Sequence, residues 1–174
     1  MKKQSIYLLF IITSIILTSC SNDKDKLYSE IKSIEKTLFA DDMGLNDSIA
    51  LEYTIKCDNY AKTYRDDANS PELLFKSGEV LSGLGRYDAA IRRFQDVYNI
   101  YPNYKKRPES IFICGFIFDT HLQDKENADY HYNKFIKEYP NHKLYQEAKT
   151  ALANSGKSAE ELVREFEAKN KTKQ

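Results

Sequence analysis

Tryptophan is absent from the 174-residue chain, and glycine and proline are scarce, with 6 and 4 residues. So few helix-breaking residues, together with 13 tyrosines and 9 phenylalanines, favour a helical protein whose helices pack through aromatic rings. An excess of one charge sign is also missing, because 26 basic residues balance 26 acidic ones. We therefore expect neither a nucleic-acid-binding surface nor an acidic tail, and the length suits one domain.

Motifs for catalysis and metal binding are lacking as well. His121, His131 and His142 stand 10 and 11 residues apart, which is no metal spacing, and no His-Glu-x-x-His or paired-cysteine motif accompanies them. Gly156-Lys157-Ser158 ends like a phosphate-binding loop, but Ala151 stands where that loop needs glycine, so we expect a helix-ending turn. We predict no enzyme, no metal site and no small-molecule substrate.

The first 20 residues have the pattern of an export signal. Lys2 and Lys3 precede an apolar stretch from Ile6 to Leu17, which is too short to span a bilayer as a helix of about 20 residues. The stretch leads into Leu17-Thr18-Ser19-Cys20, which resembles the lipobox of bacterial lipoproteins. An ordinary secretory signal cleaved nearby, or an uncleaved anchor, is the alternative.

The lipobox resemblance implies a specific processing of the chain. Residues 1–19 would be removed, and Cys20 would carry a covalent diacylglycerol and an N-acyl lipid, with no other cofactor. Several acyl chains would hold the protein firmly in the membrane, since each buried methylene group contributes about 0.8 kcal/mol to membrane binding. Ser21 follows the cysteine, as in outer-membrane lipoproteins of enteric bacteria, and residues 20–26 would form a tether. No polybasic surface is evident, so we expect attachment by the lipid alone.

A helix–turn–helix pattern occurs twice between residues 71 and 140. Three positions recur at a separation of 37, namely Leu74, Gly78 and Leu81 against Ile111, Gly115 and Phe118. Six more recur at 38, namely Ala90, Phe94, Val97, Tyr101, Pro102 and Asn103 against Ala128, Tyr132, Phe135, Tyr139, Pro140 and Asn141. Such a period is typical of a solenoid, in which each unit buries its apolar face against its neighbours.

Apolar periodicity and capping residues place the helices around these repeats. They predict helices over residues 27–39, 49–64, 70–84, 87–101 and 111–118, one ending at 139, one through 144–151, and one over 158–169. Ser70 is the expected cap of the third, and Ser158 with Glu161 forms a capping box for the last. Residues 27–169 would thus form the helical domain, and 170–174 a frayed tail.

The spacing resembles the tetratricopeptide repeat. A small residue at Gly78, alanine at Ala90, an aromatic ring at Phe94 and proline at Pro102 match its consensus, and Gly85–Ala90 fits its inter-helix turn. The resemblance implies an all-α solenoid of about three to four antiparallel helix pairs, closed by a C-terminal capping helix. The corresponding packing positions of the next repeat are Gly115, Ala128, Tyr132 and Pro140.

In such a stack, Cys57 and Cys114 would lie on helices that are not neighbours. A disulfide between them is conceivable in an oxidising periplasm, but their Cα atoms should be farther apart than the roughly 7 Å that a bridge permits. We expect both to be buried as small hydrophobic residues.

The resemblance also implies a concave groove lined by the first helix of each repeat. Its candidate residues are Phe75, Glu79, Ser82, Phe112, Phe116 and Asp119. The three rings would favour an apolar or amphipathic peptide. Because aromatic residues at helical spacing also form cores, the alternative is that these rings pack inside the protein.

The Tyr-Pro-Asn ends of both repeats resemble those of the tetratricopeptide lipoproteins of the outer-membrane β-barrel assembly machinery and of the periplasmic tetratricopeptide proteins of the Tol–Pal system. This implies an adaptor or scaffold that binds protein partners in the cell envelope, held by its lipid at the periplasmic face of the outer membrane of a Gram-negative bacterium. The alternatives are a periplasmic holdase-type chaperone, which would bind apolar segments promiscuously, and an accessory subunit of an envelope hydrolase or transporter.

Overall fold

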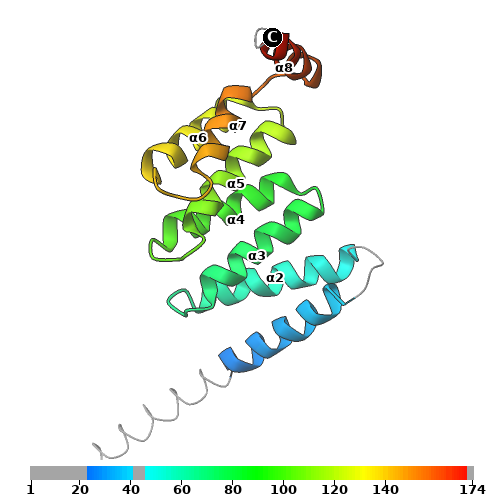
Figure 1. Ribbon diagram of the computed structural model, residues 1–174. Coiled ribbons are helices and arrows are strands. Elements are labelled where there is room, and N and C mark those ends of the chain that lie inside the picture. Colours follow the sequence, from blue (N-terminus) through cyan, green and yellow to red (C-terminus); the bar gives the residue numbers. More distant parts are fainter. Residues whose placement is uncertain (1–22, 41–45, 172–174) are drawn as a thin grey trace, which may run out of the picture. The chain divides into compact units, whose positions relative to one another are not determined.

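A computed structural model describes residues 23–40 and 46–171, and these residues form helices joined by turns, with no strand among them (Figure 1). A first described helix covers residues 23–38. It is followed by α2 (Asp47–Thr63), α3 (Ser70–Gly83), α4 (Tyr87–Ile100), α5 (Arg107–Thr120), α6 (Lys125–Glu138), α7 (Tyr145–Asn154) and α8 (Ala159–Lys171). The predicted all-α class is confirmed. The predicted signal segment and Cys20 lie outside the described residues.

Polar side chains at the helix ends explain where several helices begin. Asn46 caps α2 by accepting from the backbone N–H groups of Ser48 and Ile49, at 3.1 and 3.2 Å. The predicted capping box of α8 is confirmed, because Ser158 N–H donates to Glu161 Oε2 at 2.9 Å and Glu161 N–H donates to Ser158 Oγ at 3.2 Å.

The predicted cap of α3 is wrong. Asn69 occupies the cap position, and Ser70 is the first helical residue. The Ser70 hydroxyl instead donates to the Tyr64 carbonyl oxygen at 2.6 Å, which ties the start of α3 to the end of α2. A serine before proline has the same local pattern in both roles, so only the fold of the preceding turn distinguishes them.

The chain divides into two compact units, one ending at Leu84 and the other beginning at Gly85. The boundary falls in the turn between α3 and α4, where Gly85 has a φ of +70° that glycine adopts without strain. The two helices of the repeat predicted from Gly78 to Pro102 therefore belong to different units.

The first unit packs the helix of residues 23–38, α2 and α3 around one core. Its buried residues are Ile31, Leu38, Ala50, Tyr53, Cys57, Tyr60, Leu73 and Val80. Polar contacts join the helices at the edge of this core: Lys56 pairs with Glu30 at 2.8 Å, Lys76 pairs with Glu35, and Ser77 donates to Asp58 at 3.0 Å. These contacts hold the three helices together as one unit.

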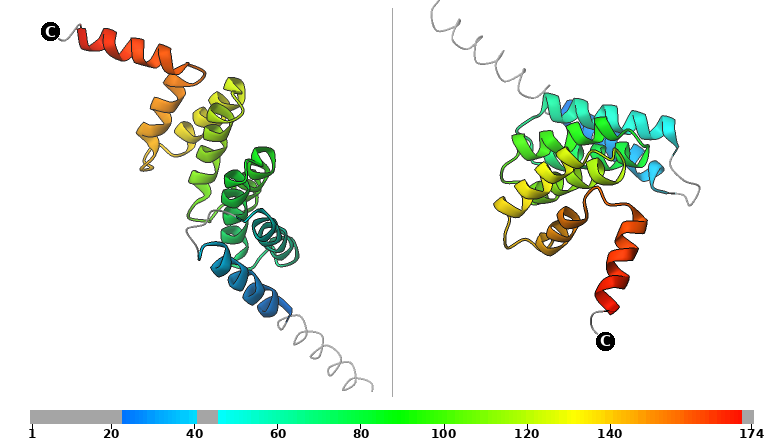
Figure 2. Two further views of the ribbon diagram at one scale, coloured as in Figure 1. Left: turned by 90° about the vertical axis from the view of Figure 1, so that its right-hand side faces the viewer. Right: turned by 90° about the horizontal axis from the view of Figure 1, so that it is seen from above.

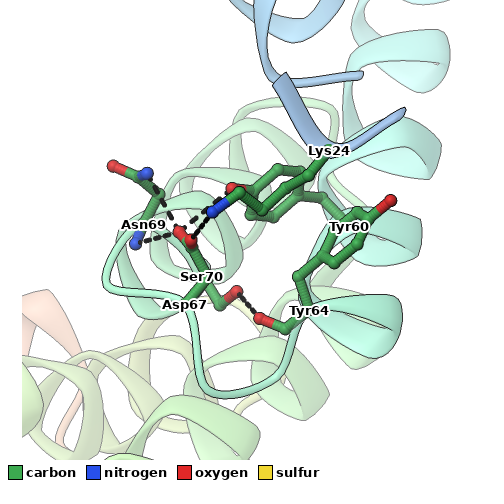
Figure 3. A network of polar contacts seen from close by, with 6 residues as sticks. All are labelled: Lys24, Tyr60, Tyr64, Asp67, Asn69 and Ser70. Atoms are coloured by element: carbon green, nitrogen blue, oxygen red, sulfur yellow. Dashed lines mark hydrogen bonds and ion pairs between the residues drawn. The ribbon is translucent and has the colours of Figure 1, made fainter. Parts of the chain in front are cut away.

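Asp67 organises the turn between α2 and α3 (Figure 3). One of its carboxylate oxygens accepts from the Tyr60 hydroxyl at 3.0 Å and from the Asn69 backbone and side chain at 2.9 Å, and the other pairs with Lys24 at 2.8 Å. Burial alone would raise the pKa of Asp67, but the hydrogen bonds from Lys24, Asn69 and Tyr60 outweigh it and lower the pKa from 3.8 to about 2.

The second unit packs α4, α5, α6 and α7 in succession, each against the next (Figure 2). One of its core clusters joins Tyr98, Ile111, Phe135 and Ala148, which come from four different helices. The small residues predicted at the helix crossings, Ala90 and Ala128, are fully buried. The fold is thus a tetratricopeptide-type solenoid of antiparallel helix pairs, as predicted.

Most of the residues that were predicted to pack the repeats are buried, and two of them lie in turns. Phe94 and Tyr132 are buried, and so is Gly78. Gly115 contacts the Tyr132 ring so closely that an added Cβ would lie 2.9 Å from two ring carbons. Pro102 and Pro140 are exposed in the turns that follow α4 and α6. Burial therefore supports a packing role for Phe94, Tyr132, Gly78 and Gly115, whereas the exposed Pro102 and Pro140 do not have one.

Both described cysteines are free and buried. This agrees with the prediction that Cys57 and Cys114 act as small hydrophobic residues. Within the part of the chain that the structure describes, none of the helices combines the length and hydropathy that a bilayer crossing needs.

Gly115→Ala should lower the free energy of unfolding by about 1–3 kcal/mol, because the new methyl group would collide with the Tyr132 ring. Urea unfolding followed by circular dichroism measures the loss. Gly83→Ala is the matched control, since a Cβ there meets nothing within 4 Å, and it should leave stability unchanged or slightly higher. Equal stability of Gly115→Ala and the parent protein would contradict the close contact.

Asp67→Asn should lower the free energy of unfolding by about 1–2 kcal/mol at neutral pH, after allowance for solvent screening. Because the pKa of Asp67 is lowered in the folded state to about 2, its contribution is complete above pH 4 and is lost as the pH falls toward 2. The difference between parent and variant should therefore vanish in acid. The exposed neighbour Asp66→Asn should change stability little at any pH.

Candidate partner-binding surface

The predicted groove residues of α3 do not form one accessible surface. Phe75 is only 3% exposed, so it belongs to the core. The prediction left groove and core open for this ring, and the structure decides for the core. Glu79 is exposed and Ser82 is half-buried. Of the three α3 candidates, the two polar residues remain accessible.

The two predicted rings of α5 differ in exposure. Phe112 is half-buried and packs its ring against those of Tyr132 and Phe135, with centroids 5.8 and 5.5 Å apart. Phe116 is 45% exposed, which is unusual for so large an apolar side chain. The accessible apolar surface of α5 is therefore centred on Phe116, whereas Phe112 lies between this surface and the core.

Phe116 forms part of an aromatic cluster with His121 and Tyr87. The His121 ring contacts Phe116 edge to face, with centroids 6.1 Å apart, and stacks on Tyr87 at 4.2 Å. Tyr87 comes from the first turn of α4 and His121 from the end of α5, so packing of α4 against α5 brings them together. These three rings, which we name the aromatic cluster, offer flat apolar faces with a polar edge.

Asp119 has a structural role at the end of α5. Its Oδ1 accepts from the backbone N–H of Gly156 at 3.2 Å, which connects α5 to the turn after α7. Burial, and then the proximity of Asp119, raises the pKa of the Tyr132 hydroxyl. Asp119 also lines a cavity of about 690 Å³ bordered by the end of α7 and the start of α8, with Ala151 and Leu162 on its wall.

A second hollow lies on the first unit. Leu27, Leu51 and Ile55 line a groove of about 530 Å³, with Glu52 and Lys56 at its border. Ile55 is 66% exposed. We name this hollow the α2 groove. Neither the α2 groove nor the aromatic cluster was predicted as a whole, because each depends on residues from separate helices.

Nucleophilic and metal-binding chemistry has little support among the described residues. Burial raises the pKa of both thiols, Cys57 and Cys114, to about 12, so they are protonated at neutral pH. His131 is buried with its Nδ1 facing the Asn127 carbonyl oxygen at 2.7 Å, and burial lowers its pKa. Within residues 23–40 and 46–171, no three His, Cys, Asp or Glu side chains gather as metal ligands would.

Comparison with known families accounts for the repeat geometry. Residues 72–104 and 114–142 match the sequence profile of the tetratricopeptide repeat. The chain thus contains two tetratricopeptide repeats. The first match covers nearly all of α3 and all of α4, and the second covers the second half of α5 and all of α6, so they agree with the two repeats found from spacing. A comparison with curated proteins gave no match.

Tetratricopeptide repeats are scaffolds for protein–protein interaction and are generally not catalytic. The aromatic cluster joins the two matched repeats, since Tyr87 belongs to the first and Phe116 and His121 belong to the second. Sequence reasoning found Phe116 through its place on the first helix of the repeat, but it missed Tyr87 and His121. Tyr87 was considered only as part of an inter-helix turn and His121 only as a metal ligand, and neither local pattern reveals their stacking.

Phe116→Ser should change the free energy of unfolding by less than about 1 kcal/mol, because nearly half of the Phe116 side chain already contacts water. Phe135→Ala should instead cost about 3–5 kcal/mol, since that ring is fully buried. Thermal unfolding of the two variants compares them directly. A large loss of stability in Phe116→Ser would show that the Phe116 ring belongs to the core.

Proposed function

We propose that this tetratricopeptide repeat protein is a lipid-anchored adaptor that holds a partner in a cell-envelope assembly, at the periplasmic face of the outer membrane. The observation that carries the proposal is the exposed Phe116 on the first helix of a matched repeat, flanked by His121 and Tyr87. An exposed group of rings on a scaffold repeat suits the binding of another polypeptide.

The aromatic cluster favours a partner with apolar side chains on one face. Phe116 supplies apolar area, whereas the ring nitrogens of His121 and the Tyr87 hydroxyl can form hydrogen bonds at its edge. Interfaces often depend on a few aromatic residues that are rigidly held by their neighbours. An amphipathic helix or an extended segment that inserts one apolar side chain beside Phe116 is the ligand that this arrangement supports.

Two sequence features support the anchor and its location. Leu17-Thr18-Ser19-Cys20 resembles a lipobox, and Ser21 is compatible with sorting to the outer membrane. The Tyr-Pro-Asn turns at 101–103 and 139–141 resemble those of envelope scaffold proteins. Diacylation and N-acylation of Cys20 would keep the repeats beside the bilayer, where envelope machines assemble.

The α2 groove supports a second candidate function, that of a holdase-type chaperone. Its lining residues Leu27, Leu51 and Ile55 offer apolar area beside the polar residues of the same groove, Ser48, Glu52, Lys56 and Asn59. Such a surface binds unfolded apolar segments with little selectivity. The two functions differ in the surface used, because an adaptor would depend on Phe116 and a chaperone on Ile55.

Crosslinking in intact cells, followed by affinity purification of the tagged full-length protein and mass spectrometry, tests the proposal. We expect one reproducible envelope partner, crosslinked near α5, that is lost in Phe116→Ser and kept in Ile55→Ser. A diverse set of unfolded envelope proteins that is lost only in Ile55→Ser would favour the chaperone instead.

Cell fractionation of Cys20→Ala tests the anchor separately. The parent protein should sediment with outer membranes and carry acyl chains on Cys20, as shown by the mass of its N-terminal peptide. Cys20→Ala should lose these acyl chains and leave the membrane fraction. A variant that stays wholly with membranes would overturn lipid anchoring through Cys20.

A further inference from the structure

The second unit has opposite charges at its two ends, although the whole chain is balanced. At one end the chain runs through residues 97–110 and 134–148, where six residues are basic and three acidic. At the opposite end, residues 86–90, 117–128 and 151–162 contain three basic and six acidic residues. We name residues 97–110 and 134–148 the basic end. The overall charge balance of the sequence hides this separation.

Contacts between residues distant in sequence bring the two segments of the basic end together. Arg107 donates from Nε to the Tyr98 carbonyl oxygen at 2.8 Å and from Nη1 to the Tyr139 hydroxyl at 2.5 Å. The Lys134 ammonium lies 4.4 Å from the centroid of the Tyr98 ring. Glu109 faces both His142 and Lys143 at 3.5 Å. The turns after α4 and α6 therefore form one continuous surface.

Two of the three acidic residues of this surface are held by internal contacts. Glu109 faces two basic side chains, and Glu138 accepts from the Tyr98 hydroxyl. By contrast, residues 105, 137 and 143 are exposed lysines, and the Lys143 side chain retains 74% of its accessibility. The basic end consequently presents positive charge to the solvent.

The composition of the basic end fits a membrane surface. Five of its six basic residues are lysines, namely Lys105, Lys106, Lys134, Lys137 and Lys143. Lysine is a compact charge on a flexible stem, which suits mobile phosphate groups better than the fixed geometry of one protein partner. Half-buried tyrosines stand among these lysines, at 101, 104, 139 and 145. Tyrosine with lysine is the combination found where proteins meet lipid headgroups.

We propose that the basic end binds the anionic headgroups of the bilayer in which the protein is anchored. The inference rests on the proposed lipid anchor, which keeps the second unit close to the bilayer, so that contacts too weak to act alone become effective. Each lysine near an anionic surface adds a modest attraction that salt weakens. The opposite, acidic end would be repelled, so that binding sets the orientation of the second unit to the membrane.

The test uses the full lipidated protein in nanodiscs, made either from a phosphatidylglycerol–phosphatidylcholine mixture or from phosphatidylcholine alone. Hydrogen–deuterium exchange reports on peptides covering 97–110 and 134–148. We expect exchange there to be about ten-fold slower in the anionic discs at about 0.05 M salt, and this slowing to disappear at about 0.5 M. Equal exchange in the two kinds of disc would overturn the inference.

A matched pair of triple variants separates local charge from net charge. Lys105→Gln, Lys137→Gln and Lys143→Gln together should abolish the slowing. Lys36→Gln, Lys62→Gln and Arg92→Gln remove the same charge from exposed positions outside the basic end, and should preserve it. Equal losses in both triple variants would show that only net charge matters, which contradicts a defined surface.

Two further outcomes separate this inference from the proposed function. A protein that does not remain with phosphatidylcholine discs would overturn the anchor, and the inference with it. A protein that remains with both discs but shows no headgroup dependence leaves the adaptor intact and overturns the basic end alone. Slower hydrogen–deuterium exchange of the basic end with soluble polyglutamate, but not with phosphatidylglycerol discs, would overturn the inference. It would indicate that the basic end binds an acidic protein instead.

Discussion

The close approach of α6 to α5 is the constraint on which the second unit depends. The Tyr132 ring lies against the backbone of Gly115, where no side chain intervenes, and Ala128 keeps the helices close one turn away. With α5 and α6 in register, Phe135 reaches the core beside Ile111 and Ala148, and α7 packs on α6. A larger residue at position 115 would separate the pair and weaken every later contact in the unit.

Polar groups then determine how the turns between helices are held. Asp67 binds Lys24, Tyr60 and Asn69 in the first unit, and Arg107 binds the turn residues of two successive repeats in the second. These contacts are partly buried, so salt screens them less than it screens exposed ion pairs. In both units a basic side chain bridges segments that the repeat alone would leave separate.

The same packing leaves some apolar side chains outside the core, and these carry the proposed functions. Phe116 is exposed, and its ring contacts that of His121, which in turn stacks on Tyr87. Ile55 is exposed on α2, next to Leu27 of the preceding helix. An adaptor and a chaperone are thus distinguished by two separate surfaces, each supported by its own helices.

The sequence by itself determined the helices, their order and the class of fold. Turn residues and caps act locally, so the Ser158–Glu161 capping box and the recurring Tyr-Pro-Asn ends could be interpreted without a structure. Packing roles for Gly115 and Tyr132 followed from the repeat, because small and aromatic residues recur at fixed separations, whereas their mutual contact is visible only in the structure.

Tertiary structure alone decided the exposure of individual rings and the distribution of charge. Phe75 and Phe112 occupy the same position in their repeats, 37 residues apart, yet Phe75 is buried and Phe112 is only half-buried. The lysines at 105, 137 and 143 share a surface because α4, α5, α6 and α7 alternate in direction. Exposure and proximity depend on neighbours that are distant along the chain, and local periodicity contains no information about them.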